Sequence, residues 1–273
     1  MSKALNELGT WFSDVFQIIG ARPLNVIIVG ACAFGVEVAL GVVDLIGGAI
    51  AETVATDGAT VVSALMKFVG FLVRPLVTAA VLGCALAWAR GRDATLADAA
   101  LEGGSLLKTY LAVLLATLLP GLVAVFILAP FAGGGAAMVY SGGEEMLPVL
   151  VGLLILGGLI AFPVLLAVGA LVLFAPALSA DRSLGPIAAL RESASMARTD
   201  ILGLMLFILL MGVFFTVFTC IACLTLCLGF VFYYPLYVLF PTLAYRSYFG
   251  LGPDPRPAEL PPYMTPHPPQ HGM

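Results

Sequence analysis

The segment Ile201–Tyr245 contains no Asp, Glu, Lys or Arg, and this feature restricts the fold more than any other. As one straight helix at about 1.5 Å per residue, the segment would be about 67 Å long, roughly twice the ~30 Å hydrocarbon core of a bilayer. It therefore predicts a hairpin of two membrane-spanning helices that turns near Cys220–Gly229.

The rest of the chain is also too apolar for a water-soluble domain. Hydrophobic residues make up 61% of the sequence, charged residues only 10%, and the mean hydropathy is +1.09. In lipid, continuous helices satisfy the backbone N–H and C=O groups internally, so we expect an all-α polytopic membrane protein with six transmembrane helices. The predicted spans of this domain, residues 1–250, are 24–50, 61–88, 111–131, 147–178, 201–222 and 224–245.

The Lys and Arg residues outside these spans all lie at the termini or in every second connection. They are Lys3, Arg22, Arg90, Arg92, Lys108, Arg182, Arg191, Arg198, Arg246 and Arg256. The alternate connections, near 51–60, 132–146 and 220–229, contain no cation. Because cytoplasmic loops of membrane proteins are enriched in Lys and Arg, the pattern predicts a multi-pass protein of the cytoplasmic (inner) membrane with both termini in the cytoplasm.

Residues 4–19 form an amphipathic pattern with helical periodicity. The apolar face consists of Leu5, Leu8, Trp11, Phe12, Val15, Phe16 and Ile19. We expect an interfacial helix in the plane of the membrane, with Trp11 among the lipid headgroups. The alternative is an ordinary helix packed beneath the bundle. The arginines of the two central cytoplasmic connections, Arg90, Arg92, Arg182, Arg191 and Arg198, are expected at the same interface, facing lipid.

Four ionisable residues lie inside the first two predicted spans: Glu37, Asp44, Lys67 and Arg74. In an antiparallel hairpin, residues at equal depth have position numbers with a constant sum, and both opposite-charge pairs add to 111. We therefore predict a deep Glu37–Arg74 pair and an Asp44–Lys67 pair nearer the outer surface. An unpaired charge inside a membrane is costly and is usually functional, so the groups could line a polar cavity for an ion, a proton or a lipid headgroup. Alternatively, the pairs only fix the hairpin.

Three cysteines, Cys220, Cys223 and Cys227, lie near the predicted outer turn of the last hairpin. Their thiols are candidates for a metal site or a disulfide, but the spacing also suits small residues at a close helix crossing. The only histidines, His267 and His271, lie outside the spans. This excludes intramembrane bis-His haem ligation and a Ser–His dyad, so we expect no cofactor.

The segment 251–273 is rich in proline and is expected to be a disordered cytoplasmic tail. It or the cytoplasmic loops could dock a protein partner; the alternative is a tail that is simply solvated. Nucleic-acid binding has no support, because the sequence has no basic patch interleaved with aromatic residues. Membrane lipids are the expected partners.

The stretch 173–198, LFAPALSADRSLGPIAALRESASMAR, resembles the signature of a broad, uncharacterised six-helix membrane family of bacteria and archaea. The family includes the membrane domain fused to some glycerophosphodiester phosphodiesterases. The resemblance implies the six-span fold and its topology, but no activity. The sequence therefore predicts a non-enzymatic membrane protein, a scaffold or envelope-associated factor that contacts lipid. The alternative is a small transporter or channel with a polar site at the charged first hairpin.

Overall fold

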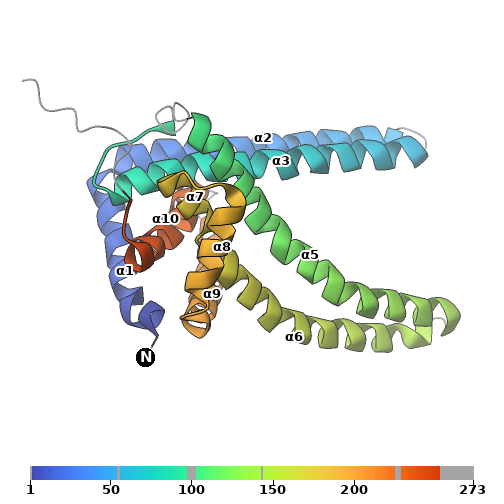
Figure 1. The fold of residues 1–273 in the computed structure, drawn as a ribbon. Coiled ribbons are helices and arrows are strands. Elements are labelled where there is room, and N and C mark those ends of the chain that lie inside the picture. The colour runs from blue at the N-terminus through green and yellow to red at the C-terminus, as the bar shows by residue number, and fades with distance from the viewer. Residues whose placement is uncertain (1, 54–55, 97–102, 143, 225–228, 253–273) are drawn as a thin grey trace, which may run out of the picture.

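The computed structural model describes residues 2–53, 56–96, 103–142, 144–224 and 229–252, and no strand occurs among them. The helices are α1 (Lys3–Ala21), α2 (Pro23–Thr53), α3 (Thr56–Ala89), α5 (Gly103–Gly142), η1 (Glu144–Met146), α6 (Leu147–Val172), α7 (Ala175–Arg182), α8 (Pro186–Ala197), α9 (Ile201–Leu224) and α10 (Phe230–Phe249) (Figure 1). The disordered tail predicted for 251–273 lies outside the described residues from 253 onward.

Among the residues that the structure describes, five helical segments are long and apolar enough to cross a membrane. They are Pro23–Ile46, Ser63–Ala89, Leu106–Ala137, Leu147–Arg182 and Ile201–Leu224. The structure is therefore all-helical and compatible with a membrane-embedded protein, as the composition predicts. Helix α10, which contains most of the predicted sixth span, is not among these five segments.

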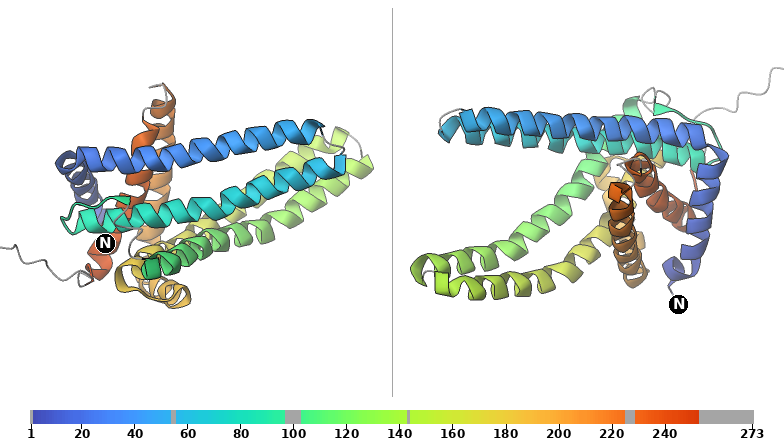
Figure 2. Two further views of the ribbon diagram at one scale, coloured as in Figure 1. Left: turned by 90° about the horizontal axis from the view of Figure 1, so that it is seen from above. Right: turned by 180° about the vertical axis from the view of Figure 1, so that it is seen from behind.

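Two long helical hairpins dominate the shape of the molecule. Helix α2 packs against α3, and α5 packs against α6. The hairpins meet through α3 and α5 near one end and diverge toward their tips (Figure 1). Helices α9 and α10 are divided between them, because α10 packs against α2 and α3 whereas α9 packs against α6 (Figure 2). The last hairpin predicted from the sequence is thus not a closely packed pair.

The second hairpin differs from its prediction at both ends. The connection expected at 132–146 is mostly helical, because α5 continues to Gly142. The Gly- and Ala-rich segment after Phe131 remains apolar, and this favours continued helix over a loop. Helix α6 runs through Pro163 and ends at Val172, so the predicted fourth span, 147–178, ends inside the separate helix α7.

The hydrophobic core lies where the hairpins come together. Its largest fully buried side chains include Trp88, Phe174, Phe240 and Tyr245. The short helices α7 and α8, which lie within the stretch 173–198, pack into this core. Ser193 of α8 fixes the break before α7, since its hydroxyl accepts from the Phe174 N–H at 3.2 Å and donates to the Leu171 carbonyl at 2.8 Å.

Helix α1 packs along α9 and α10, and the expectation of a lipid-facing Trp11 is wrong. Trp11 is only 2% exposed, and its ring meets that of Phe207 edge-on at 5.2 Å between centroids. Phe12 contacts Phe240 in the same way at 4.6 Å. Because α9 and α10 touch each other less than they touch the hairpins, α1 can bury Trp11 and Val15 between them, whereas Leu5 and Phe16 of its apolar face are exposed. This is the alternative in which the helix packs against the bundle.

Candidate functional site

A cavity of about 1050 Å³ lies between the two hairpins. Its walls come from α3, α5, α6, α7, α9 and α10, so every long helix except α1 and α2 contributes to it. Most of the lining side chains are apolar. The sequence suggested a polar cavity at the first hairpin as one alternative but not this mostly apolar one, because its lining is assembled from segments as distant as Lys67 and Thr242. The charged residues of α3 gave the only hint of its position.

The Glu37–Arg74 ion pair forms at the edge of this cavity. Arg74 Nε lies 3.2 Å from Glu37 Oε2, the contact predicted from their equal depth. Tyr234 of α10 donates its hydroxyl proton to the other oxygen, Oε1. Glu37 therefore holds α2, α3 and α10 together through one carboxylate. The Glu37 side chain is 22% exposed, whereas that of Arg74 is 58% exposed and lines the cavity.

The second predicted pair is not formed. Asp44 and Lys67 are both exposed, and no ion pair joins them among the described residues. In straight helices a seven-residue step drifts about 20° away from the line of contact, so a pair one heptad from a good contact need not face its partner. Lys67 lines the cavity instead, on the same face of α3 as Arg74.

Threonine hydroxyls contribute little free polarity to the cavity wall. Each of five lining threonines donates its proton to the carbonyl four residues earlier in its own helix. These bonds are Thr78 to Arg74 (3.1 Å), Thr117 to Val113 (2.9 Å), Thr216 to Gly212 (2.8 Å), Thr219 to Phe215 (2.7 Å) and Thr242 to Val238 (2.8 Å). The polar groups left to meet a ligand are mainly donors: Lys67, Arg74 and the phenols of Tyr233 and Tyr237.

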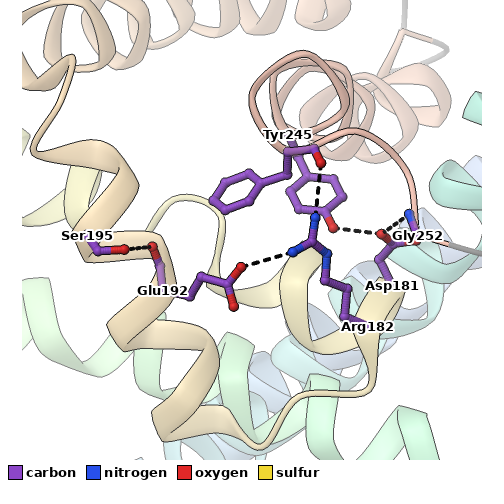
Figure 3. Close-up of polar contacts among 7 residues, drawn as sticks. Asp181, Arg182, Glu192, Ser195, Tyr245 and Gly252 are labelled. Atoms are coloured by element: carbon purple, nitrogen blue, oxygen red, sulfur yellow. Dashed lines mark hydrogen bonds and ion pairs between the residues drawn. The ribbon is translucent and has the colours of Figure 1, made fainter.

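A polar cluster holds α7 to the ends of α3 and α10 beside the core. The Asp181 carboxylate is fully buried; it pairs with Arg90 and accepts from the Tyr245 hydroxyl at 2.6 Å and from the Gly252 N–H at 2.7 Å. The next residue, Arg182, pairs with Glu192 at 3.0 Å and donates to the Phe249 carbonyl at 3.0 Å (Figure 3). Because its groups are bonded to one another, this cluster fixes the fold.

The arginines expected at the lipid interface therefore divide into two groups. Arg90 is wrong as a lipid-facing residue, because its side chain is 12% exposed and is directed to Asp181. Arg182 is directed to Glu192 and to α10, and Arg92 is half-buried. Arg191 on α8 and Arg198 directly after it are exposed and have no ion-pair partner among the described residues. The buried carboxylate of Asp181 explains why Arg90 turns inward.

The cysteine cluster is not assembled in the described part of the chain. Cys220 and Cys223 are free thiols near the end of α9, and Cys220 lines the cavity. Cys227 lies outside the described residues. No group of three or more potential metal-ligating residues occurs among those the structure describes.

Comparisons with protein-family models, with curated proteins and with solved structures found no match to this chain.

Proposed function

We propose that this chain is a non-enzymatic six-span protein of the cytoplasmic membrane that holds a lipid molecule in the cavity between its two hairpins. The alternation of cationic and cation-free connections supports six crossings with both termini in the cytoplasm. In this topology α10 is the sixth span. The resemblance of stretch 173–198 to a six-helix membrane family agrees with the same arrangement.

The observation that carries the proposal is the character of the cavity wall. A space of about 1050 Å³ is lined mainly by apolar side chains, with a few polar donors. Sites for small molecules combine a mostly apolar surface with a few placed polar groups. Within a bilayer, the abundant molecules that have a long apolar part and a polar end are the lipids.

The same wall is poorly equipped for catalysis. Among the described residues that line the cavity there is no Asp, Glu or His. The threonine hydroxyls donate to their own helices, so no adjacent base activates them. Binding without a covalent reaction is the function that this composition supports.

Transport is a second candidate, supported by prolines around the cavity. Pro75, Pro120 and Pro241, which lie inside α3, α5 and α10, all line it. Proline removes a backbone hydrogen bond within a helix, and transporters use interrupted helices to build binding sites near the bilayer midplane. If the protein is a transporter, it moves the bound lipid across the membrane instead of retaining it in the cavity.

Filling the cavity tests the proposal. Gly212 lines the cavity, and a Cβ added there meets no atom within 4 Å, so Gly212→Trp should fold and occupy the space. Gly158→Trp on α6 is the matched control, because Gly158 has equally free surroundings outside the cavity. Native mass spectrometry of the purified proteins should show lipid retained by the wild type and by Gly158→Trp, and lost from Gly212→Trp. Equal lipid retention in all three proteins would contradict the proposal.

A further inference from the structure

Arg74 uses only one side of its guanidinium group within the protein. Its Nε contacts Glu37, and no bond to its two terminal nitrogens occurs among the described residues. The side chain is 58% exposed and lines the cavity. The terminal nitrogens of arginine form a planar pair of donors that matches two oxygens of a carboxylate or phosphate. Glu37 thus fixes the direction of Arg74 and leaves its binding edge open.

Lys67 provides a second cation on the same wall. It lies seven residues before Arg74 on α3, about 10 Å away along the helix axis and on the same helical face. Lys67 is exposed, and no carboxylate pairs with it among the described residues. A lysine without a counter-charge inside a membrane span is costly, so its position calls for an anionic ligand.

The charge balance of the cavity defines this ligand further. Two cations, Lys67 and Arg74, line the wall, and the described lining residues include no carboxylate. Glu37, which contacts Arg74 Nε and does not itself line the cavity, neutralises one of the two positive charges. The site therefore has one uncompensated positive charge beside a large apolar surface. A phospholipid with a single net negative charge complements both parts.

Resting on the proposed function, we propose that the cavity selects an anionic phospholipid and holds its phosphate between Lys67 and Arg74. The lysine binds the phosphate as a point charge, and the arginine binds it through two parallel N–H donors. The acyl chains lie along the apolar walls between the hairpins. The phenols of Tyr233 and Tyr237, which line the same cavity, are placed to donate to the remaining headgroup oxygens.

The test compares phosphatidylglycerol with phosphatidylcholine, because both carry a phosphate but only the first has a net negative charge. The protein is purified, reconstituted in nanodiscs containing both lipids in equal amounts, and released for native mass spectrometry. The variants are Lys67→Gln and Arg74→Gln. Arg191→Gln is the matched control, since it removes the same charge from an exposed site on α8 outside the cavity.

We expect the wild type and Arg191→Gln to retain phosphatidylglycerol in preference to phosphatidylcholine. Either Lys67→Gln or Arg74→Gln removes the net positive charge of the site, and this should lower the preference for the anionic lipid about tenfold. Lys67→Gln breaks no ion pair among the described residues, so this variant gives a clear answer even if Arg74→Gln unfolds. Millimolar inorganic phosphate should not displace the lipid, because it lacks the apolar part; displacement by phosphate alone would reassign the site to a soluble anion and overturn the proposal.

Failure of this inference is distinguishable from failure of the proposed function. If Lys67→Gln and Arg74→Gln keep the wild-type preference, charge selection by these residues is wrong, although lipid binding in the cavity stands. If the wild type retains both lipids equally, the inference fails in the same way. If the wild type retains neither lipid, both the inference and the proposed function fail.

Discussion

Arg90 and Asp181, which are 91 residues apart in the chain, form the least exposed ion pair among the described residues. The arginine follows the end of α3 directly, and the aspartate lies in the last turn of α7. Since Asp181 also accepts from Tyr245 of α10 and from the Gly252 N–H, one carboxylate connects three parts of the chain. Its position at the cavity-lining helix α7 makes it important for the stability of the whole fold.

Replacing Asp181 by Ala should destabilise the protein strongly. The change leaves the Arg90 guanidinium buried without its counter-charge, and breaking a buried pair in this way costs about 3–5 kcal/mol. The control is Asp93→Ala, which removes an aspartate that pairs with Arg22 and whose side chain is 75% exposed. For this variant we expect the free energy of unfolding to fall by less than about 1 kcal/mol. Thermal unfolding in detergent measures both. Similar melting temperatures for the two variants would contradict the structural role of Asp181.

Gly30 should not tolerate even an alanine. A Cβ at this position would lie 1.7 Å from the carbonyl oxygen of Val231, so α2 and α10 would have to separate. We expect Gly30→Ala to cost roughly 1–3 kcal/mol, the range for overpacked cores. Gly35→Ala lies on the same helix with no atom within 4 Å of the added Cβ, and should be neutral or slightly stabilising. Chemical denaturation of both variants in one detergent tests the difference.

The Glu37–Arg74 contact should appear as energetic coupling in a double-mutant cycle. Arg74→Ala leaves the Glu37 carboxylate with Tyr234 alone, so adding Glu37→Gln should partly restore stability. We expect a coupling energy of roughly 0.5–3 kcal/mol, as found for contacting residues. The cycle of Asp44→Asn with Lys67→Ala serves as the control, because these residues do not pair. Strictly additive losses in the first cycle would argue against the contact.

Docking of the N-terminus should depend on the protonation of Asp200. Burial raises the pKa of this carboxyl, but donation from the Tyr248 hydroxyl, the Ala4 N–H and the Ser2 hydroxyl outweighs burial, and the pKa lies below its usual 3.8. A carboxyl whose pKa is lower in the folded than in the unfolded protein stabilises the fold at pH values above the unfolded pKa. This stabilisation is lost as the pH falls from the unfolded pKa through the folded one.

We therefore expect α1 to loosen as the pH falls from about 4 toward the lower pKa of the folded protein. Trp11 reports this directly, since it packs against Phe207; in a Trp88→Phe background it is the remaining tryptophan. Its fluorescence should shift to the red in this window. The same signal should show no such step in Asp200→Asn, and an identical pH profile in both proteins would rule out the assignment.

The proposed topology predicts opposite sides for two sets of positions. In a background without native cysteines, Tyr140→Cys and Glu145→Cys near the tip of the second hairpin should react with an impermeant maleimide in intact cells. Arg191→Cys on α8 and Arg198→Cys directly after it should react only after the cells are opened. All four positions are exposed in the structure. Labelling of both sets from the same side would disprove the six-span arrangement.

The first hairpin shows how far sequence reasoning can reach. Its boundaries and the Glu37–Arg74 contact follow from local apolar length and from simple register, because neighbouring antiparallel helices preserve depth. The same argument fails one heptad away at Asp44 and Lys67, since depth does not define which way a side chain points around the helix. The depth of a residue along its helix axis is thus easier to predict than the direction in which its side chain points around that axis.

The remaining errors concern partners that are distant in the chain. Amphipathic patterning identifies the apolar face of α1 but cannot say whether lipid or α9 covers it, and Trp11 proves to be covered by protein. The Asp181 cluster was missed because Arg90, Tyr245 and Gly252 come from well-separated segments. Nothing in the local sequence around any one of these residues indicates the other three.

The division of α9 and α10 between the hairpins has a mechanical consequence. Helix α10 belongs with α2 and α3, whereas α9 belongs with α6. The molecule thus consists of two halves, α2–α3–α10 and α5–α6–α9, that enclose the interior space and are joined through α1 and the Asp181 cluster. Rotation of one half against the other would change the width of that space while leaving Glu37 bound to Arg74 and Tyr234, since all three residues are on the same half.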